Sequence, residues 1–175
     1  MNLKMILQRF LIPAPLVTLY YYFKYGAIVS MKAEVEYCST LKMGRGTRIA
    51  SFCKVKATHG PLELGDNVHL GVGCFLSSHE GGLYIGNDVL LSPHVSIIAS
   101  NYRYDQIDVP LRLQGHTSQG IRIGNNVWVG TGSVILDNTQ IGDGVIISPN
   151  SVVSAMIPDN AIVQGNPAKV IFIRR

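Results

Sequence analysis

The chain has 175 residues, which is enough for one well-buried domain and short for two. Hydrophobic residues make up 47% of it and charged residues only 15%, a composition that excludes intrinsic disorder. The net charge of +4 includes no run of five or more basic residues, so no nucleic-acid partner is expected.

Residues 1–34 form a hydrophobic N-terminal segment. Its uncharged stretch 10–23 contains two prolines and is too short to span a bilayer. A small-residue cleavage site is missing, so the segment does not read as a signal peptide. We expect it to pack against the domain or a neighbouring subunit. The alternative is peripheral contact with a membrane through residues 5–25. The basic residues that would then lie near lipid headgroups are Lys4, Arg9 and Lys24.

A six-residue repeat covers most of the remaining chain, from 35 to 157. In it an aliphatic residue followed by Gly recurs, and further aliphatic residues fall six positions on. Neither helical spacing nor the alternation of an antiparallel strand produces this period. Hexads of this kind predict an all-β fold, a parallel β-helix in which three short strands make one coil. The aliphatic–Gly pairs begin at Met43, Leu64, Leu70, Ile85, Ile123, Val129 and Ile141.

The spacing of equivalent coil starts shows where the repeat is interrupted. Met43, Leu64, Ile85, Ile123 and Ile141 are separated by 21, 21, 38 and 18 residues. Three bare hexads make 18 residues, so the first three coils carry insertions, and each insertion falls in the third hexad. All of them are therefore expected at one edge of a three-sided prism.

The longest insertion is the loop 99–120. Because the insertions share an edge, His59, His79 and Tyr102 are expected to lie near one another there. Stacked coils rise by about 4.8 Å, the spacing of hydrogen-bonded strands. Loops on a rigid scaffold are where binding and catalytic residues concentrate, so this edge is the predicted site.

Four segments resemble the hexapeptide-repeat acetyltransferases. They are "IGNDVLLSPHVSIIASNYRYD", "IRIGNNVWVGTGSVIL", "IGDGVIISPNSVV" and "IVQGNPAKVI". The family includes sugar and polysaccharide O-acetyltransferases, the maltose and galactoside acetyltransferases and the xenobiotic acetyltransferases. The resemblance runs from about residue 35 to 173. It implies a left-handed β-helix, usually a homotrimer, that binds acetyl-CoA and an acceptor between adjacent subunits.

In this family a His in the long loop acts as general base on the acceptor hydroxyl, which then attacks the thioester. The loop typically reads Asn-His or Thr-His, followed by a short polar stretch ending in Asp. Asn101 and Asp105 match this pattern, but Tyr102 holds the His position. An unperturbed phenol has a pKa of about 10, so Tyr102 would be a poor base. It is expected to orient an acceptor or stack on it.

Other histidines could supply the base. His79 is the first candidate, because its insertion leaves the coil directly before the 99–120 loop, and Glu80 beside it could polarise an acceptor. His116 lies in the long loop and could enter the site of a neighbouring subunit. His69 and His94 fall in regular hexads and are expected at the surface or at subunit contacts. The predicted catalytic set is His79, Tyr102 and His116, with Glu80, Asn101 and Asp105 as substrate-binding residues.

The resemblance also implies a coenzyme A track that ends in the C-terminal basic tail, residues 158–175. Where relatives commonly carry Gly-Ala-Gly-Ser-Val-Val-Thr-Lys, this chain reads "SPNSVVSA", so a hydroxyl is kept and a cation is lost. No metal is expected. The predicted cofactor-binding residues are Thr131, Ser154, Ala155, Lys169, Arg174 and Arg175.

The three cysteines form no CxxC pair and leave an odd number, which argues against a disulfide framework. A reducing, cytoplasmic location is expected, at the inner face of the membrane if the N-terminal segment contacts lipid. Cys53 and Cys74 hold the same hexad position and should stack inside adjacent coils. Trp128 is expected to pack at a coil corner.

Three functions follow from these observations. The first is an acetyl-CoA-dependent acetyltransferase that acts on a sugar or polysaccharide precursor hydroxyl or amine. The second is a non-catalytic member that binds acyl-CoA or sugar, or supports an active partner. The third is a metal-dependent hydratase of the γ-carbonic anhydrase type, although the close His pair that such enzymes carry within one coil is missing.

Overall fold

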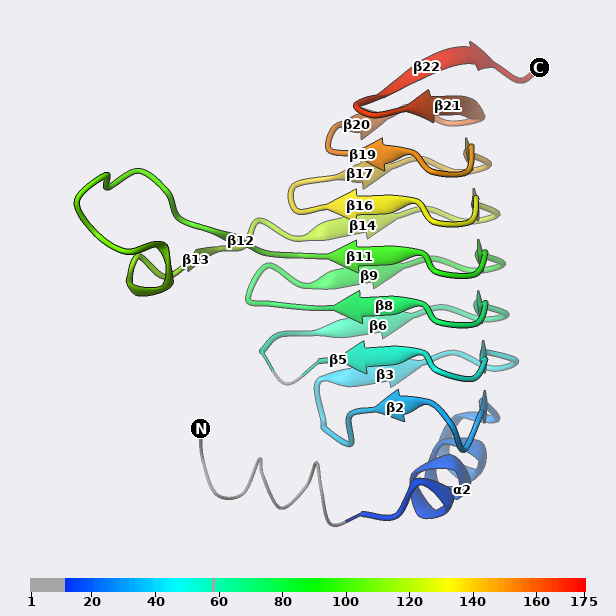
Figure 1. The fold of residues 1–175 in the computed structure, drawn as a ribbon. Helices are drawn as coiled ribbons and strands as arrows, with labels where there is room; N and C mark the ends of the chain where they lie inside the picture. Colours follow the sequence, from blue (N-terminus) through cyan, green and yellow to red (C-terminus); the bar gives the residue numbers. More distant parts are fainter. Residues whose placement is uncertain (1–11, 58) are drawn as a thin grey trace.

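In the computed structural model, which describes residues 12–57 and 59–175, the predicted coils stack into a three-sided prism (Figure 1). The prediction of an all-β parallel helix with one long loop is confirmed. The first eleven residues lie outside the described part of the chain. The expectation of a membrane contact through residues 5–25 can therefore be followed only from Ile12 onward.

Each face of the prism is a parallel sheet made of one strand from each coil. Face A contains β1 (Ile28–Val29), β4 (Arg48–Ile49), β7 (His69–Leu70), β10 (Leu90–Leu91), β15 (Trp128–Val129), β18 (Ile146–Ile147) and β21 (Ala161–Gly165). Face B contains β2 (Glu34–Val35), β5 (Lys54–Lys56), β8 (Phe75–Ser77), β11 (Ser96–Ile98), β16 (Val134–Leu136) and β19 (Val152–Val153). Face C contains β3 (Leu41–Met43), β6 (Leu62–Leu64), β9 (Leu83–Ile85), β14 (Ile121–Ile123), β17 (Gln140–Ile141) and β20 (Met156–Ile157).

The register of face C agrees with the predicted coil starts. Met43 pairs with Leu64, and Leu64 pairs with Ile85. Ile85 pairs with Ile123 across the long loop, and Ile123 pairs with Ile141. The hydrogen-bonded ladder therefore continues unchanged past an insertion, because the extra residues leave the prism at its corner.

The inward aliphatic residues fill a continuous core along the prism axis. Val55, Leu76, Ile97 and Ile135 pair in succession on face B and are fully buried. The two cysteines of adjacent coils, Cys53 and Cys74, are also buried, as predicted. Each coil therefore buries its apolar side chains mainly against its two neighbours.

A ladder of side-chain oxygens follows the edge between faces C and A. Each oxygen accepts a hydrogen bond from the backbone N–H of the coil before it, with N···O distances from 2.5 to 2.9 Å. These short polar residues suit a turn because their side chains can bond to nearby backbone. The ladder therefore closes this edge from coil to coil. Its acceptors are Asp66, Asn87, Asn125, Asp143 and Asp159.

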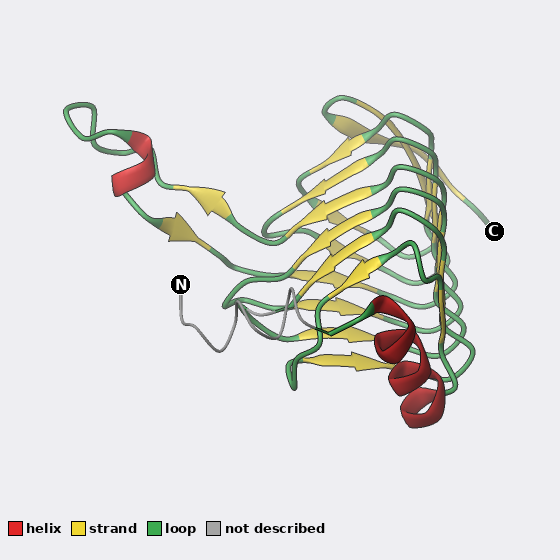
Figure 2. Cartoon of the chain, turned by 60° about the horizontal axis from the view of Figure 1, so that its bottom comes forward, coloured by secondary structure: helices red, strands yellow, loops and turns green. Residues whose placement is uncertain are grey.

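Helix α2 (Ala14–Tyr25) covers the N-terminal end of the prism (Figures 1 and 2). A proline in its first turn favours helix initiation, and Gly26 ends the helix in the left-handed conformation at φ 66°. Tyr21 is buried against the first coil, and its hydroxyl donates to the Glu36 carbonyl oxygen at 2.8 Å. Helix α2 thus packs on its own domain.

The coils extend beyond the predicted range of 35–157 at both ends. The first coil begins at Ile28, where no aliphatic–Gly pair marks the strand. At the other end β21 continues face A, and β22 (Ala168–Ile173) folds back antiparallel along it. The predicted tail 158–175 is therefore mostly ordered strand (Figure 1).

Stability should depend on the axial core. Replacing Ile97 by Ala, at a position with 0% exposure, should lower the free energy of unfolding by about 2–5 kcal/mol. The same truncation at Leu111, which is 57% exposed, should change it by less than about 0.5 kcal/mol. Urea denaturation of both variants measures the difference, and equal losses would contradict the assignment of the core.

Candidate functional site

The insertion at residues 99–120, called the arm below, projects from the edge between faces B and C (Figures 1 and 2). Its two sides pair as antiparallel strands β12 (Asn101–Tyr102) and β13 (His116–Thr117). A short 3₁₀ helix, η1 (Leu111–Leu113), follows the tip. Gln114 closes the tip, because its side-chain amide donates to the carbonyl oxygens of Gln106 and Val109 at 2.7 and 2.6 Å.

The root of the arm is held by Asp137 from the next coil. Its carboxylate is nearly buried and accepts from the N–H groups of Gln119 and Gly120 at 2.8–3.1 Å. In the coil register, Asp137 occupies the place that Ala57, Ser78 and Ala99 hold in the earlier coils. An acidic residue at a position that is otherwise Ala or Ser indicates a structural role for Asp137. We did not predict this role from the sequence.

A second anchor joins the arm to the preceding insertion. The Ser118 hydroxyl donates to the Ala99 carbonyl oxygen at 2.7 Å and accepts from the N–H of Gly81 at 2.9 Å. Gly81 and Gly120 approach so closely that a Cβ on either one would overlap the backbone of the other. The sequence "HEGG" therefore needs its glycine here, and the His79 loop is fixed against the arm.

Four aromatic rings line up at this root. The His59 and His79 rings stack with centroids 5.4 Å apart and planes 14° apart. His79 also contacts His116, at 5.5 Å between ring centroids, and His116 contacts Tyr102 at 4.3 Å. The predicted neighbourhood of His59, His79 and Tyr102 is thus observed. His116 joins it within the same chain, since β12 and β13 set Tyr102 opposite His116.

His79 lies in the middle of this row. Its Nδ1 atom is buried and has no hydrogen-bond partner among the described residues. Buried polar atoms are normally paired, and exceptions often mark sites where a ligand or water completes the network. Tyr102 and His116 are both exposed, so their outer sides are open to a substrate.

Two of the predicted substrate-binding residues adjoin the row in the chain, and the third lies further out on the arm. Glu80 follows His79 and is exposed, and Asn101 precedes Tyr102 on β12. Asp105 lies further out on the arm and forms an ion pair with Arg103 at 3.3 Å. Hydrogen bonding to the Arg103 guanidinium holds the pKa of the Asp105 carboxyl below its usual range, so this side chain stays charged.

The predicted cofactor residues do not meet within one chain. Thr131 lies in the turn between β15 and β16, on the edge between faces A and B. Ser154 and Ala155 lie on the arm's edge, between β19 and β20, about 14 Å along the axis from the His79 coil. Lys169, Arg174 and Arg175 lie on or just beyond β22 at the C-terminal end, where Arg174 donates to the Gly144 carbonyl oxygen at 2.6 Å.

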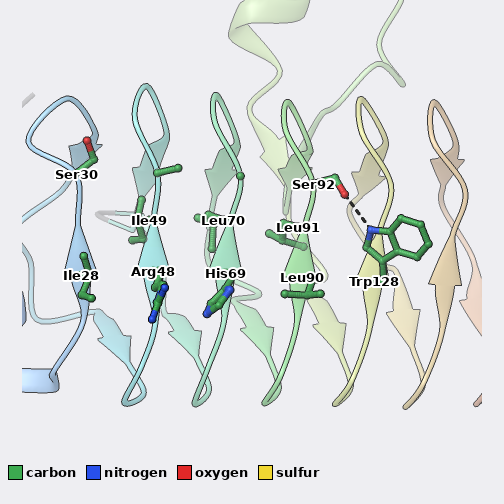
Figure 3. A pocket seen from close by; sticks show the side chains of 12 residues that line it. Ile28, Ser30, Arg48, Ile49, His69, Leu70, Leu90, Leu91, Ser92 and Trp128 are labelled. Carbon is green, nitrogen blue, oxygen red and sulfur yellow. Dashed lines mark hydrogen bonds between the residues drawn. The ribbon is translucent and has the colours of Figure 1, made fainter.

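A shallow groove of about 450 Å³ crosses the outer surface of face A (Figure 3). Outward side chains of successive strands line it, including Arg48, His69, Leu90 and Trp128. The Trp128 indole N–H donates to the Ser92 hydroxyl at 2.9 Å, and the ring is 45% exposed. The prediction that Trp128 packs at a coil corner is wrong, because it lies on the outward side of β15.

The histidine row does not have the geometry of a zinc site. Rings that stack almost in parallel, as His59 and His79 do, direct their nitrogens side by side rather than toward one point. Within residues 12–57 and 59–175, no group of three or more His, Cys, Asp or Glu residues is arranged to hold a metal ion. Within the described residues of one chain, the histidine row therefore does not form a zinc site.

Comparison with known proteins agrees with this architecture. The profile of the family described as bacterial transferase hexapeptide (six repeats) matches residues 120–155. A probable acetyltransferase from Mycobacterium tuberculosis is 33% identical over 135 residues, which cover 77% of this chain and 45% of that protein. The putative lipopolysaccharide biosynthesis O-acetyl transferase WbbJ from Escherichia coli is 27% identical over 155 residues, covering 85% of this chain and 76% of that protein.

The fold is shared with AntD, an N-acyltransferase from Bacillus cereus, in the crystal structure of a variant in complex with dTDP and coenzyme A. The TM-score is 0.78 at 20% identity, over 90% of this chain and 88% of that chain. This protein is therefore a left-handed β-helix of hexapeptide repeats. Its sequence is similar to those of hexapeptide-repeat acetyltransferases, and it spans 45% of the length of the mycobacterial relative.

The anchor at Asp137 can be tested by limited proteolysis. Replacing Asp137 by Ala removes the acceptor of two backbone N–H groups, each worth about 1–3 kcal/mol when buried and unpaired. Chymotrypsin should then cleave the arm at Tyr102 or Tyr104 at least about ten-fold faster, because the arm opens more often.

The matched control is Asp143→Ala. Asp143 also accepts a backbone N–H, that of Asn125, but on the edge between faces C and A. Its loss should leave cleavage of the arm unchanged. Equal acceleration in both variants would show a general loosening of the prism and contradict a local anchor.

Proposed function

We propose that this protein transfers an acyl group, with acetyl-CoA as the expected donor, to a hydroxyl or amine of a saccharide. The supporting observation is the row of His79, His116 and Tyr102 at the root of the arm. In this row an imidazole that can act as a base lies next to an exposed aromatic surface that can bind an acceptor. WbbJ is named as a putative O-acetyl transferase of lipopolysaccharide biosynthesis, and the AntD complex holds dTDP and coenzyme A, which favours a saccharide or sugar-nucleotide acceptor.

His79 is the proposed general base. It belongs to a tight insertion of the rigid prism, and its position is fixed by the contact of Gly81 with the arm. Because Nδ1 is buried, Nε2 is the nitrogen that can take the proton of the acceptor. The acceptor oxygen or nitrogen then bonds to the acyl carbon, the carbon–sulfur bond breaks, and the imidazolium returns the proton to the coenzyme A thiolate.

Tyr102 and His116 are proposed to position the acceptor. Their rings face each other across the β12–β13 pair at 4.3 Å and form an exposed aromatic surface beside His79. Such a surface can stack on a sugar ring, and the Tyr102 hydroxyl can donate to one of its oxygens. Asn101 and Glu80 add polar groups at the rim.

A homotrimer would complete the site. Thr131 and the groove on face A lie away from the edge that carries the histidine row, so one chain cannot bring them together. The arm tip is exposed and apolar, with Ile107 at 98% and Leu113 at 61% exposure. If the arm of each subunit contacts the next subunit, three such head-to-tail contacts close into a ring. The contacts would cover these apolar residues and bring the histidine row next to Thr131 and the groove of the neighbour.

Binding of the donor is tested by thermal unfolding. Acetyl-CoA at about 100 times its Kd should stabilise the native protein by about 2.7 kcal/mol and raise Tm by several degrees. Dephospho-coenzyme A is the control for the proposed phosphate contacts of Lys169, Arg174 and Arg175, and it should raise Tm less. If neither ligand shifts Tm or releases heat in calorimetry, a coenzyme A-dependent function is wrong.

Catalysis is tested with matched variants. His79→Asn should lower kcat by about 10²-fold or more, because the base is lost. Asp88→Asn is the control, since Asp88 is exposed on the edge between faces C and A at φ 56°, a conformation that Asn tolerates. Tyr102→Phe should mainly raise KM, and Tyr102→His should keep or raise turnover.

Other outcomes would assign the role of general base to another residue or show that the row is not catalytic. If His116→Asn abolishes transfer while His79→Asn does not, His116 is the base. If all these variants keep full activity, the row is not catalytic. If wild-type protein binds acetyl-CoA but transfers nothing to any saccharide acceptor offered, the replacement at Tyr102 marks a non-catalytic member.

A further inference from the structure

The positive charge of this chain is concentrated at its N-terminus. Residues 1–32 contain four of the fifteen basic residues and none of the eleven acidic ones. Residues 33–175 therefore contain eleven basic and eleven acidic residues and carry no net charge. The whole net charge of +4 lies in the segment that includes α2. The four basic residues are Lys4, Arg9, Lys24 and Lys32.

Helix α2 is apolar on the side that faces away from the prism. At 100° per residue, its outer side chains span about a third of the helix circumference. They are largely exposed, and none is charged or carries an amide or carboxyl group. The outer side chains are Leu16 at 56%, Leu19 at 49%, Tyr22 at 54% and Phe23 at 81% exposure.

The other side of α2 already packs on the first coil through Tyr21. A helix that is apolar all round is normally covered all round, by protein or by lipid. Four large apolar side chains on one exposed stripe are unusual on a surface that only meets water. The outer side therefore needs a partner, and the charge of the segment indicates which one.

Lys24 is held at the border of this stripe. Its ammonium donates to the Tyr20 hydroxyl at 2.7 Å and lies 4.9 Å from the centroid of the Tyr25 ring. The hydrogen bond to Tyr20 raises the pKa of Lys24, which keeps the side chain cationic. In membrane proteins, tyrosine and basic side chains are enriched at the headgroup level, next to the apolar side chains that enter the acyl region. Lys24 and the tyrosine hydroxyls lie beside the apolar stripe in the same order.

We propose that the outer side of α2, defined by Leu16, Leu19, Tyr22 and Phe23, rests on an anionic lipid surface. The apolar side chains enter the acyl boundary, and Lys24 at the border of the stripe meets the anionic headgroups. The 12 residues of α2 are about 18 Å long, and no helix in the described part of the chain is long and apolar enough to cross a bilayer. The proposed contact is peripheral.

Charge argues against the other occupants. A second copy placed with its α2 against this one would bring two segments of the same positive charge together. Residues 1–11 contain Lys4 and Arg9 and no acid, so they would add charge to the stripe rather than neutralise it. An anionic bilayer supplies both the apolar phase and the opposite charge.

The test is sedimentation of the full chain with vesicles of phosphatidylcholine, with or without phosphatidylglycerol. We expect binding to the anionic vesicles, at least ten-fold weaker binding to the neutral ones, and release at about 1 M salt, where the Debye length falls to about 3 Å. Because no substrate is needed, this readout stays independent of the acyltransferase proposal.

Two variants locate the contact. Leu19→Ser with Phe23→Ser should weaken binding to anionic vesicles at least ten-fold and leave Tm unchanged, since both side chains are exposed. Phe172→Ser is the matched control, because Phe172 is 53% exposed on β22 at the other end of the prism. Lys24→Gln with Lys32→Gln should reduce the difference between anionic and neutral vesicles.

Three results would overturn the proposal. The first is failure of the wild-type chain to sediment with anionic vesicles. The second is unchanged vesicle binding in the Leu19/Phe23 variant, with loss only when residues 1–11 are deleted. The third is a smaller assembly of that variant in light scattering without vesicles, which would show that the stripe contacts another copy.

Discussion

The parallel register between coils is the constraint on which the whole structure depends. Each inward aliphatic residue meets its equivalent in the next coil, as Met43 meets Leu64 and Ile85 meets Ile123. A slip by one residue would turn the core outward along an entire strand. Additional residues can therefore be accommodated only at a corner. The same requirement that builds the core thus confines the insertions to the corners, with their polar side chains outside the core.

Much of the fold and part of the site follow from counting this register in the sequence. The spacing predicted the coils, the shared edge and the neighbourhood of His59, His79 and Tyr102. The pairing of Tyr102 with His116 could not be predicted, because it depends on where the arm turns, and the hexads say nothing inside an insertion. Asp137 was missed although an acid is unusual at its hexad position, because its partners are backbone groups that only the folded arm presents. Trp128 was misplaced because period alone does not tell a corner from an outward strand position.

The candidate site combines a stiff element and an extended one. His79 is held by the prism, whereas His116 and Tyr102 lie on the arm, whose root depends on Asp137 and Ser118. The proposed base on the stiff element would keep its geometry, while the proposed acceptor-binding surface on the arm could adapt to its ligand. The groove on face A and the helix α2 lie elsewhere on the prism. The arm, the groove and α2 are therefore three separate surfaces of one chain.

Because of the ladder of Asp and Asn side chains, the edges of the prism differ in whether they can accept inserted residues. Along the edge between faces C and A, every turn from Arg45 to Asp143 is tied to its successor by a side-chain oxygen. An added residue there would break two such ties. At the arm's edge, loops of very different length coexist in consecutive coils. Loops along the arm's edge can thus vary in length and sequence, while the edge between faces C and A keeps the coils aligned. The arm's edge is therefore the place where a new loop could be inserted into this scaffold.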